Sequence, residues 1–205
     1  MKKPFRLLIA VPSTGIMAAD FVKSLIQLTE HLQHEGIAHH VEITAGTLVY
    51  LARNSLACKA INENFTHLLF LDSDMIFHDT IVEDLLFCGK DFVCGAFQSR
   101  RPPYGSCIFK SLRPVERVKE YGMEPFRVDG CGFAAVLTKV DLLEAVRSCF
   151  GTCFRPTEMY GEDLAFCDRV KQLGREIWCE PTVRPGHIAH VPLFAGEHLF
   201  GGEKA

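Results

Sequence analysis

Four large apolar residues, Leu68 to Leu71, run directly into Asp72-Ser73-Asp74, and this junction constrains the fold more than any other part of the chain. A continuous apolar run is typical of a strand that is buried on both faces of a sheet. Two carboxylates at the end of such a strand are costly to bury without a partner. A divalent cation and a nucleotide ribose would compensate them, because carboxylate oxygens are good ligands for Mg²⁺ and Mn²⁺. We therefore expect an anion-handling site at the carboxyl edge of an open α/β sheet.

Strand-like and helix-like patterns alternate through the first part of the chain. The expected elements before the acidic pair are a strand over 5–11, a helix over 17–32, a strand over 41–44, a helix over 48–62 and the strand ending at Asp72. This order predicts a largely parallel sheet with helices on its faces. The expected elements after it are a helix over 80–88, a strand over 91–97, a loop or hairpin over 98–118, a segment over 126–137 whose apolar part 133–137 is a strand, helices over 140–146 and 161–173, and a strand over 176–179.

The composition limits the class of protein. The chain has 205 residues, of which 48% are hydrophobic and 23% charged, so we expect one compact domain over 1–205. A net charge of -3 gives no basic field that would favour nucleic acid or an anionic membrane. Nine cysteines lack a CxxC pair and the start lacks a signal peptide, which favours a reduced, intracellular chain. No apolar run is long enough for a membrane span, and the oligomeric state stays open.

Three further segments carry side chains suited to chemistry. Glu162 and Asp163 open a predicted helix, where they would act as an ordinary cap or as part of a site. His187 and His190 follow the last predicted strand and are candidate metal ligands, although single histidines are more often packed or surface residues. Arg53 lies in the helix that leads into the acidic strand, where a solvated charge is the simpler interpretation.

Taken in order, these motifs resemble a known family. An Asp-x-Asp after a strand, Gly130-x-Gly132 before an apolar strand, Gly-Glu-Asp opening a helix, then Trp178 and Gly186-His187 resemble the nucleotide-sugar glycosyltransferases of the GT-A fold. The segments LARNSLACKAINENFTHLLFLDSDMIF and GEDLAFCDRVKQLGREIWCEPTVRPGHIAH are similar to small, family-2-like enzymes of bacteriophages, large viruses and bacteria. The resemblance covers roughly residues 5–192. It implies a Rossmann-like, mostly parallel central sheet with flanking helices. It also implies a protein of the cytoplasm of a bacterium or of an infected host cell.

The resemblance also implies a metal site that uses Mn²⁺ or Mg²⁺. Asp74 is the carboxylate expected to bind the metal, and Asp72 is expected at the ribose or at a metal-bound water. His187 matches the late metal-binding histidine of the family, and His190 competes with it for that role. Diphosphate oxygens and water would complete the coordination, and an imidazole ligand favours Mn²⁺.

Other residues are assigned to the donor by the same resemblance. Pro12, Ser13 and Thr14 are expected at the nucleotide base, with Ser73 between the two aspartates of the donor site. Arg53 would contact the donor phosphate or base. Gly130 and Gly132 would let the backbone approach the donor sugar, with a strand bulge or turn as a nearly equal alternative.

The implied activity is transfer of a sugar, with UDP as the favoured nucleotide, to an acceptor hydroxyl. In an inverting enzyme Asp163 is the expected general base and Glu162 orients the acceptor; in a retaining enzyme Asp163 would only bind acceptor. The acceptor would be a glycan, a lipid-linked sugar, a protein or a modified nucleobase.

Particular segments of the sequence argue against two alternative functions. A sugar-phosphate nucleotidyltransferase would need a basic, glycine-rich loop after the first strand, and residues 12–17 contain no basic residue. A dehalogenase-like phosphatase would carry its Asp-x-Asp near the chain start. A sugar-nucleotide-binding protein without turnover stays open. The cationic stretch 98–101 would hold diphosphate, grip an acidic acceptor or form a solvated turn, and the solvated turn is favoured.

Overall fold

The computed structural model describes residues 4–189 and is built around a central seven-stranded sheet. The strand order is β2 (His39–Thr44), β1 (Leu7–Pro12), β3 (His67–Leu71), β10 (Ala135–Lys139), β5 (Phe92–Gly95), β11 (Ile177–Glu180) and β8 (Phe126–Val128). Five strands run in one direction, and only β10 and β8 run against them. The predicted mostly parallel α/β sheet is therefore confirmed.

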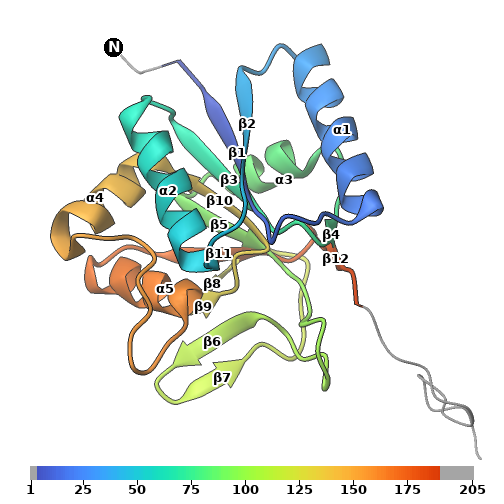
Figure 1. Cartoon of the computed structure of the whole chain (residues 1–205). Coiled ribbons are helices and arrows are strands. Elements are labelled where there is room, and N and C mark those ends of the chain that lie inside the picture. The colour runs from blue at the N-terminus through green and yellow to red at the C-terminus, as the bar shows by residue number, and fades with distance from the viewer. Residues whose placement is uncertain (1–3, 190–205) are drawn as a thin grey trace, which may run out of the picture.

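Helices cover both faces of this sheet. The helices are α1 (Ala19–His34), α2 (Val49–Asn62), α3 (Ile81–Phe87), α4 (Val140–Phe150) and α5 (Glu162–Gln172). Figure 1 shows α2, α4 and α5 together on one side, with α1 and α3 on the other. The α1–α3 layer is tied together by His31 and Glu83, whose side chains are 2.7 Å apart.

The apolar run from Leu68 to Leu71 lies at the centre of the core. The side chains from Leu68 to Leu71 are fully buried, as a strand between two helical layers requires. β3 pairs with β1 in parallel and with β10 in antiparallel register, and it ends one residue before Asp72. The acidic pair therefore leaves the sheet at the edge where β1 also ends.

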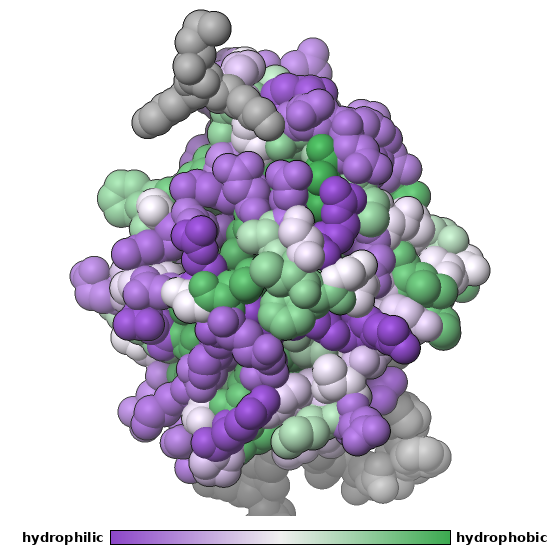
Figure 2. All heavy atoms as spheres, turned by 90° about the vertical axis from the view of Figure 1, so that its left-hand side faces the viewer, coloured by the Kyte–Doolittle hydropathy of each residue, from purple (hydrophilic) through white to green (hydrophobic). Residues whose placement is uncertain are grey.

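The outer surfaces of the helices are polar. Figure 2 shows the side of the molecule on which α4 lies in Figure 1, and most of this face is hydrophilic, with a smaller hydrophobic area near its centre. The apolar residues of α4, including Leu142, Leu143 and Val146, are turned inward and buried. Among residues 4–189, no helix combines the length and the apolar character needed to cross a bilayer. All nine cysteines are free thiols.

The segment 126–137 contains more strands than the one expected over 133–137. It forms three short strands, β8, β9 (Gly130–Cys131) and the start of β10, which serve two different sheets. β9 pairs with β6 (Ile108–Leu112), which also pairs with β7 (Val115–Arg117), so the hairpin alternative for 98–118 is confirmed. The reason for the break is close packing: a Cβ on Gly130 would lie 3.1 Å from Leu164 and 3.2 Å from Leu112.

Candidate functional site

The acidic turn and His187 are brought together by a short ladder. After β3, residues 72–74 form a turn into β4 (Met75–Ile76), which pairs in antiparallel register with β12 (Gly186–His187). The backbone N–H of Ile188 also donates to the carbonyl of Asp74 at 2.9 Å. These bonds place Nε2 of His187 3.4 Å from Oδ2 of Asp74. Two candidate metal ligands that are far apart in sequence are thus neighbours in space.

A hydrogen bond to the backbone of Gln98 fixes the orientation of the His187 ring. Its Nδ1 lies 2.9 Å from the carbonyl oxygen of Gln98, and because a carbonyl only accepts, Nδ1 carries the proton. In the neutral ring Nε2 therefore carries the lone pair, the arrangement usual for a metal-binding histidine, and in the protonated ring Nε2 donates to Asp74. The hydrogen bond with Asp74 raises the pKa of His187, although burial opposes it. Burial also disfavours charge on Asp74, but His187 and Arg100 outweigh it and lower the pKa of that carboxyl.

Arg53 is a buried cation that joins three elements of the site. Its side chain is only 4% exposed. Nη2 donates to Oδ1 of Asp72 at 2.9 Å, and Nη1 donates to Oε1 of Glu162 at 2.5 Å. The guanidinium also lies 5.4 Å from the ring centre of Phe133. Burial lowers the pKa of Arg53, but the two carboxylates outweigh it, so Arg53 stays charged.

Asp163 lies beside this network in the first turn of α5. Burial, followed by the charge of Glu162, raises the pKa of Asp163 above its usual value. The backbone N–H of Leu164 donates to Oδ1 of Asp163 at 2.7 Å, which partly offsets this. Glu162 itself is committed to Arg53. Burial raises the pKa of Asp72 as well, but Asp72 accepts from Arg53, so Asp163 is the carboxyl with a raised pKa that is not hydrogen-bonded to that arginine and can serve as a base.

One pocket of about 1010 Å³ collects these groups. The predicted site residues that line it are Pro12, Ser13, Thr14, Arg53, Asp72, Ser73, Asp74, Gly132, Glu162, Asp163 and His187. The pocket lies where β1 and β3 end, at the sheet edge that open α/β folds use for ligands. Within residues 4–189 no cluster of three or more His, Cys, Asp or Glu side chains is arranged to hold a metal. The protein thus offers a cation one carboxylate and one imidazole, which fits an ion that takes its remaining ligands from substrate oxygens and water.

This architecture is similar to that of several solved structures. No family model and no curated protein matches the chain. Among solved structures, A197 from STIV is 20% identical, with a TM-score of 0.63 over 91% of this chain and 87% of that one. GalNAc-T7, solved with UDP, GalNAc and Mn²⁺, is 12% identical, with a TM-score of 0.60 over 91% of this chain and 44% of its own. A mutant Drosophila β-1,4-galactosyltransferase 7, in complex with manganese, UDP-Gal and xylobiose, is 12% identical, with a TM-score of 0.50 over 88% and 66%.

The chain has the GT-A fold. Structural similarity at sequence identities this low shows the fold alone, and the activity depends on the residues of the pocket.

Two of the expected donor-binding residues have surroundings that differ from the expectation. Arg53 was expected at the donor, but both of its terminal nitrogens are already bound to carboxylates, so it holds the GT-A pocket together. Gly130 is not among the residues that line the pocket; it permits the close approach of α5 described above. Gly132 does line the pocket, and a Cβ there would lie 3.1 Å from Phe97. His190 lies outside the described residues.

Arg100 belongs to the cationic stretch 98–101, for which a solvated turn was favoured over a contact with diphosphate or with an acidic acceptor. Its side chain is half-exposed, and its Nη1 forms an ion pair with Oδ2 of Asp74 in the pocket. The turn after β5 and the acidic turn after β3 both line the GT-A pocket. The cationic character of residues 98–101 was the available signal, but sequence does not reveal which carboxylate faces the turn.

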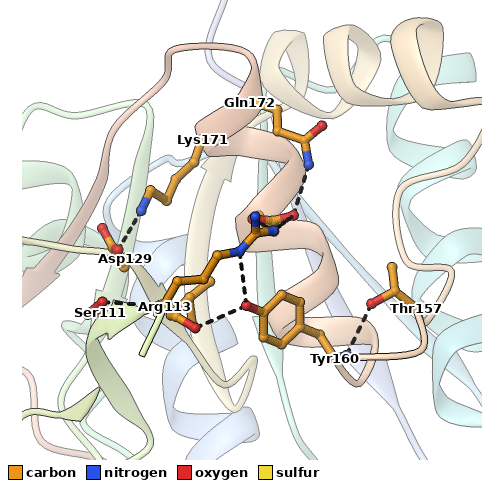
Figure 3. Close-up of polar contacts among 9 residues, drawn as sticks. Ser111, Arg113, Asp129, Thr157, Tyr160, Lys171 and Gln172 are labelled. Atoms are coloured by element: carbon orange, nitrogen blue, oxygen red, sulfur yellow. Dashed lines mark hydrogen bonds and ion pairs between the residues drawn. The ribbon is translucent and has the colours of Figure 1, made fainter. Parts of the chain in front are cut away.

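A polar network fixes the β6–β7 hairpin to α5 (Figure 3). Arg113 donates to both carboxylate oxygens of Asp168, at 3.1 and 3.2 Å. The hydroxyl of Tyr160 donates to the carbonyl of Leu112 at 3.0 Å and accepts from Nε of Arg113 at 3.4 Å. Lys171 forms an ion pair with Asp129 at the far end of the same helix face. The network anchors the residues directly before Glu162, and with them one wall of the GT-A pocket.

Proposed function

We propose that this chain is a metal-dependent glycosyltransferase that moves a sugar from a nucleoside-diphosphate sugar to an acceptor hydroxyl. The observation that carries the proposal is the 3.4 Å approach of His187 to Asp74 in the same pocket as Asp163, whose pKa is raised. The GT-A fold and neighbours that were solved with UDP or UDP-Gal and manganese support it. UDP is the nucleotide we propose on that support.

Asp74 and His187 are the residues that would hold Mn²⁺ or Mg²⁺. One carboxylate oxygen and one imidazole nitrogen suit Mn²⁺ well, and Mg²⁺ less well. When bound, the ion would stabilise the negative charge of a departing nucleoside diphosphate. Asp72 already accepts from Arg53, so we assign it to the ribose or to a metal-bound water. Pro12, Ser13 and Thr14 line the same pocket and would contact the nucleotide base.

Asp163 would act as the base of an inverting transfer. The acceptor oxygen forms a bond to the anomeric carbon while the bond from that carbon to the diphosphate oxygen breaks. The electron pair of the broken bond leaves on the diphosphate, and the acceptor proton passes to Asp163. A raised pKa favours this role, because a stronger base takes the proton more readily. Glu162, held by Arg53, would orient the acceptor.

The first test is the release of UDP from a panel of UDP-sugars, with Mn²⁺ and with chelator. We expect one donor to be hydrolysed slowly in the presence of Mn²⁺ and not in chelator, with water taking the place of the acceptor. The matched variant Asp163→Asn should bind UDP and Mn²⁺ as the wild type does but release far less sugar. Metal-dependent UDP binding without any sugar release would favour a binding protein without turnover. Absence of nucleotide binding would contradict the proposal.

A further inference from the structure

The carboxylate assigned to the metal already carries a cation. Oδ2 of Asp74 is the atom that pairs with Nη1 of Arg100, and it is also the atom nearest to Nε2 of His187. A divalent ion that binds between Asp74 and His187 would lie next to the guanidinium, and the repulsion between the two cations favours the departure of Arg100 from that oxygen. The ion pair and the proposed metal site compete for the same carboxylate atom.

Arg100 is attached in a way that allows such an exchange. Its loop is closed at the base by a bridge between Gln98 and Ser106 and by the bond from Ser99 N to Gly105 O, at 2.9 Å. The side chain of Arg100 is 49% exposed, whereas that of Asp74 is 23% exposed. The guanidinium can therefore leave the carboxylate by side-chain rotation, without opening the core.

The buried arginine of the site, Arg53, has no such freedom. Arg53 is buried, and both of its terminal nitrogens are bound to carboxylates. Releasing Arg53 would leave two partly buried carboxylates without a partner. Arg100 has one carboxylate partner and lines the same pocket, so it is the cation that can change partner.

We propose that Arg100 holds Asp74 in the metal-free protein and, once a divalent cation takes that oxygen, binds the diphosphate of the donor. This inference rests on the proposed function. A guanidinium offers two parallel N–H groups that match phosphate oxygens, so it can serve both partners. The diphosphate gains one negative charge when its bond to the sugar breaks, and a cation placed beforehand stabilises that charge.

The test measures two ligands whose affinities should change in opposite directions. Mn²⁺ alone is titrated by electron paramagnetic resonance, and UDP is titrated calorimetrically at saturating Mn²⁺. In Arg100→Ala, Mn²⁺ alone should bind about 2- to 5-fold more tightly, because no partly exposed ion pair is given up. UDP should bind about 10- to 100-fold more weakly, because charge-assisted hydrogen bonds to phosphate are lost.

A cation outside the pocket supplies the control. Lys110 on β6 does not line the pocket and pairs with Glu116 at 3.8 Å, so Lys110→Ala should leave the affinity for Mn²⁺ alone unchanged and alter UDP binding less than twofold. Arg100→Lys keeps the charge without the fork, so UDP binding should be intermediate. Asp74→Asn should abolish the binding of Mn²⁺, so that the signal of the free ion persists, and this variant confirms which site is being titrated.

Each other outcome contradicts one specific statement. If Arg100→Ala leaves both affinities unchanged, or weakens Mn²⁺ binding, the exchange of partners is wrong. If Mn²⁺ tightens but UDP binding is unchanged, the diphosphate role is wrong. If the wild type binds no UDP at any Mn²⁺ concentration, the proposed function fails, while the titration of Mn²⁺ alone still decides whether Arg100 competes with metal.

Discussion

Arg53 on α2 and Glu162 at the start of α5 are joined by a 2.5 Å hydrogen bond across 109 positions of the chain. The same guanidinium reaches Asp72 at the end of β3, so one buried cation sets the distance between the acidic turn and the candidate base next to Glu162. The shape of the pocket therefore depends on a contact that no local sequence pattern specifies.

Replacing this cation should cost stability. Arg53→Leu leaves the carboxylates of Asp72 and Glu162 without a partner, and we expect the free energy of unfolding to fall by about 3 kcal/mol. Urea denaturation measures it. Lys59→Met on the same helix removes surface pairs with Glu63 and Glu42 and should cost about 0.5–1 kcal/mol. Equal losses in the two variants would contradict the central role of Arg53.

The candidate base should control turnover and not binding. Asp163→Asn keeps the shape of the side chain but removes the proton acceptor, so kcat should fall about 10²- to 10⁴-fold. UDP affinity at saturating Mn²⁺, measured by calorimetry, should stay within about twofold of wild type. A variant that keeps full transfer activity would remove Asp163 as the base.

The pH dependence of turnover gives a second test of the same residue. A base works only when it is deprotonated, so kcat/KM should fall as the pH drops through the pKa of Asp163. Because burial and the charge of Glu162 raise this pKa, the acid limb should lie above the range of an ordinary aspartate. Glu162→Gln removes the neighbouring negative charge and should shift the limb to lower pH. A shift to higher pH would contradict the assignment.

Stability should also respond to pH through the α1–α3 contact. The hydrogen bond to Glu83 raises the pKa of His31 in the folded state. The pair therefore stabilises the fold fully below the unfolded histidine pKa, and this contribution is lost as the pH rises through the folded value. Glu83→Gln should lower the urea midpoint more at pH 5.5 than at pH 8.5. His34→Gln, an exposed histidine beside Glu35, is the control and should show no such difference.

The hairpin network should stabilise the wall of the pocket. Tyr160→Phe removes the donor to the carbonyl of Leu112 and a partner of Arg113, at an expected cost of about 1 kcal/mol. Amide hydrogen exchange in 108–117 should become faster, while exchange in β3 stays as in wild type. Gln172→Ala removes an exposed bond to Asp168 and should leave the hairpin amides unchanged. Faster exchange throughout the sheet would indicate a general loss of stability instead.

Much of this architecture follows from local patterns. The apolar run from Leu68 to Leu71 predicts a central strand because such a strand is stable only between two layers, and it also predicts where Asp72 and Asp74 leave the core. The division of 126–137 into three strands was not predictable, because it depends on how closely α5 packs over Gly130.

The same limit applies to the charges of the pocket. Arg53 and Arg100 could be recognised from sequence as cations near a candidate site, but their partners are chosen by the tertiary fold. The sequence does not distinguish an arginine that lies in solvent from one that pairs with a buried carboxylate, whether the arginine is in a helix or in a loop. Burial decides between these roles, and burial is set by elements distant in sequence.

The short ladder between β4 and β12 is completed by residues that follow the last strand of the central sheet in the chain. All seven strands of the central sheet are complete by Glu180, whereas the imidazole that faces Asp74 arrives only with His187. A nascent or proteolysed chain ending between these two positions would contain every strand of the sheet and lack one of the two side chains proposed to hold the metal. Under the proposed function, such a fragment is expected to keep the sheet and to lack metal-dependent activity.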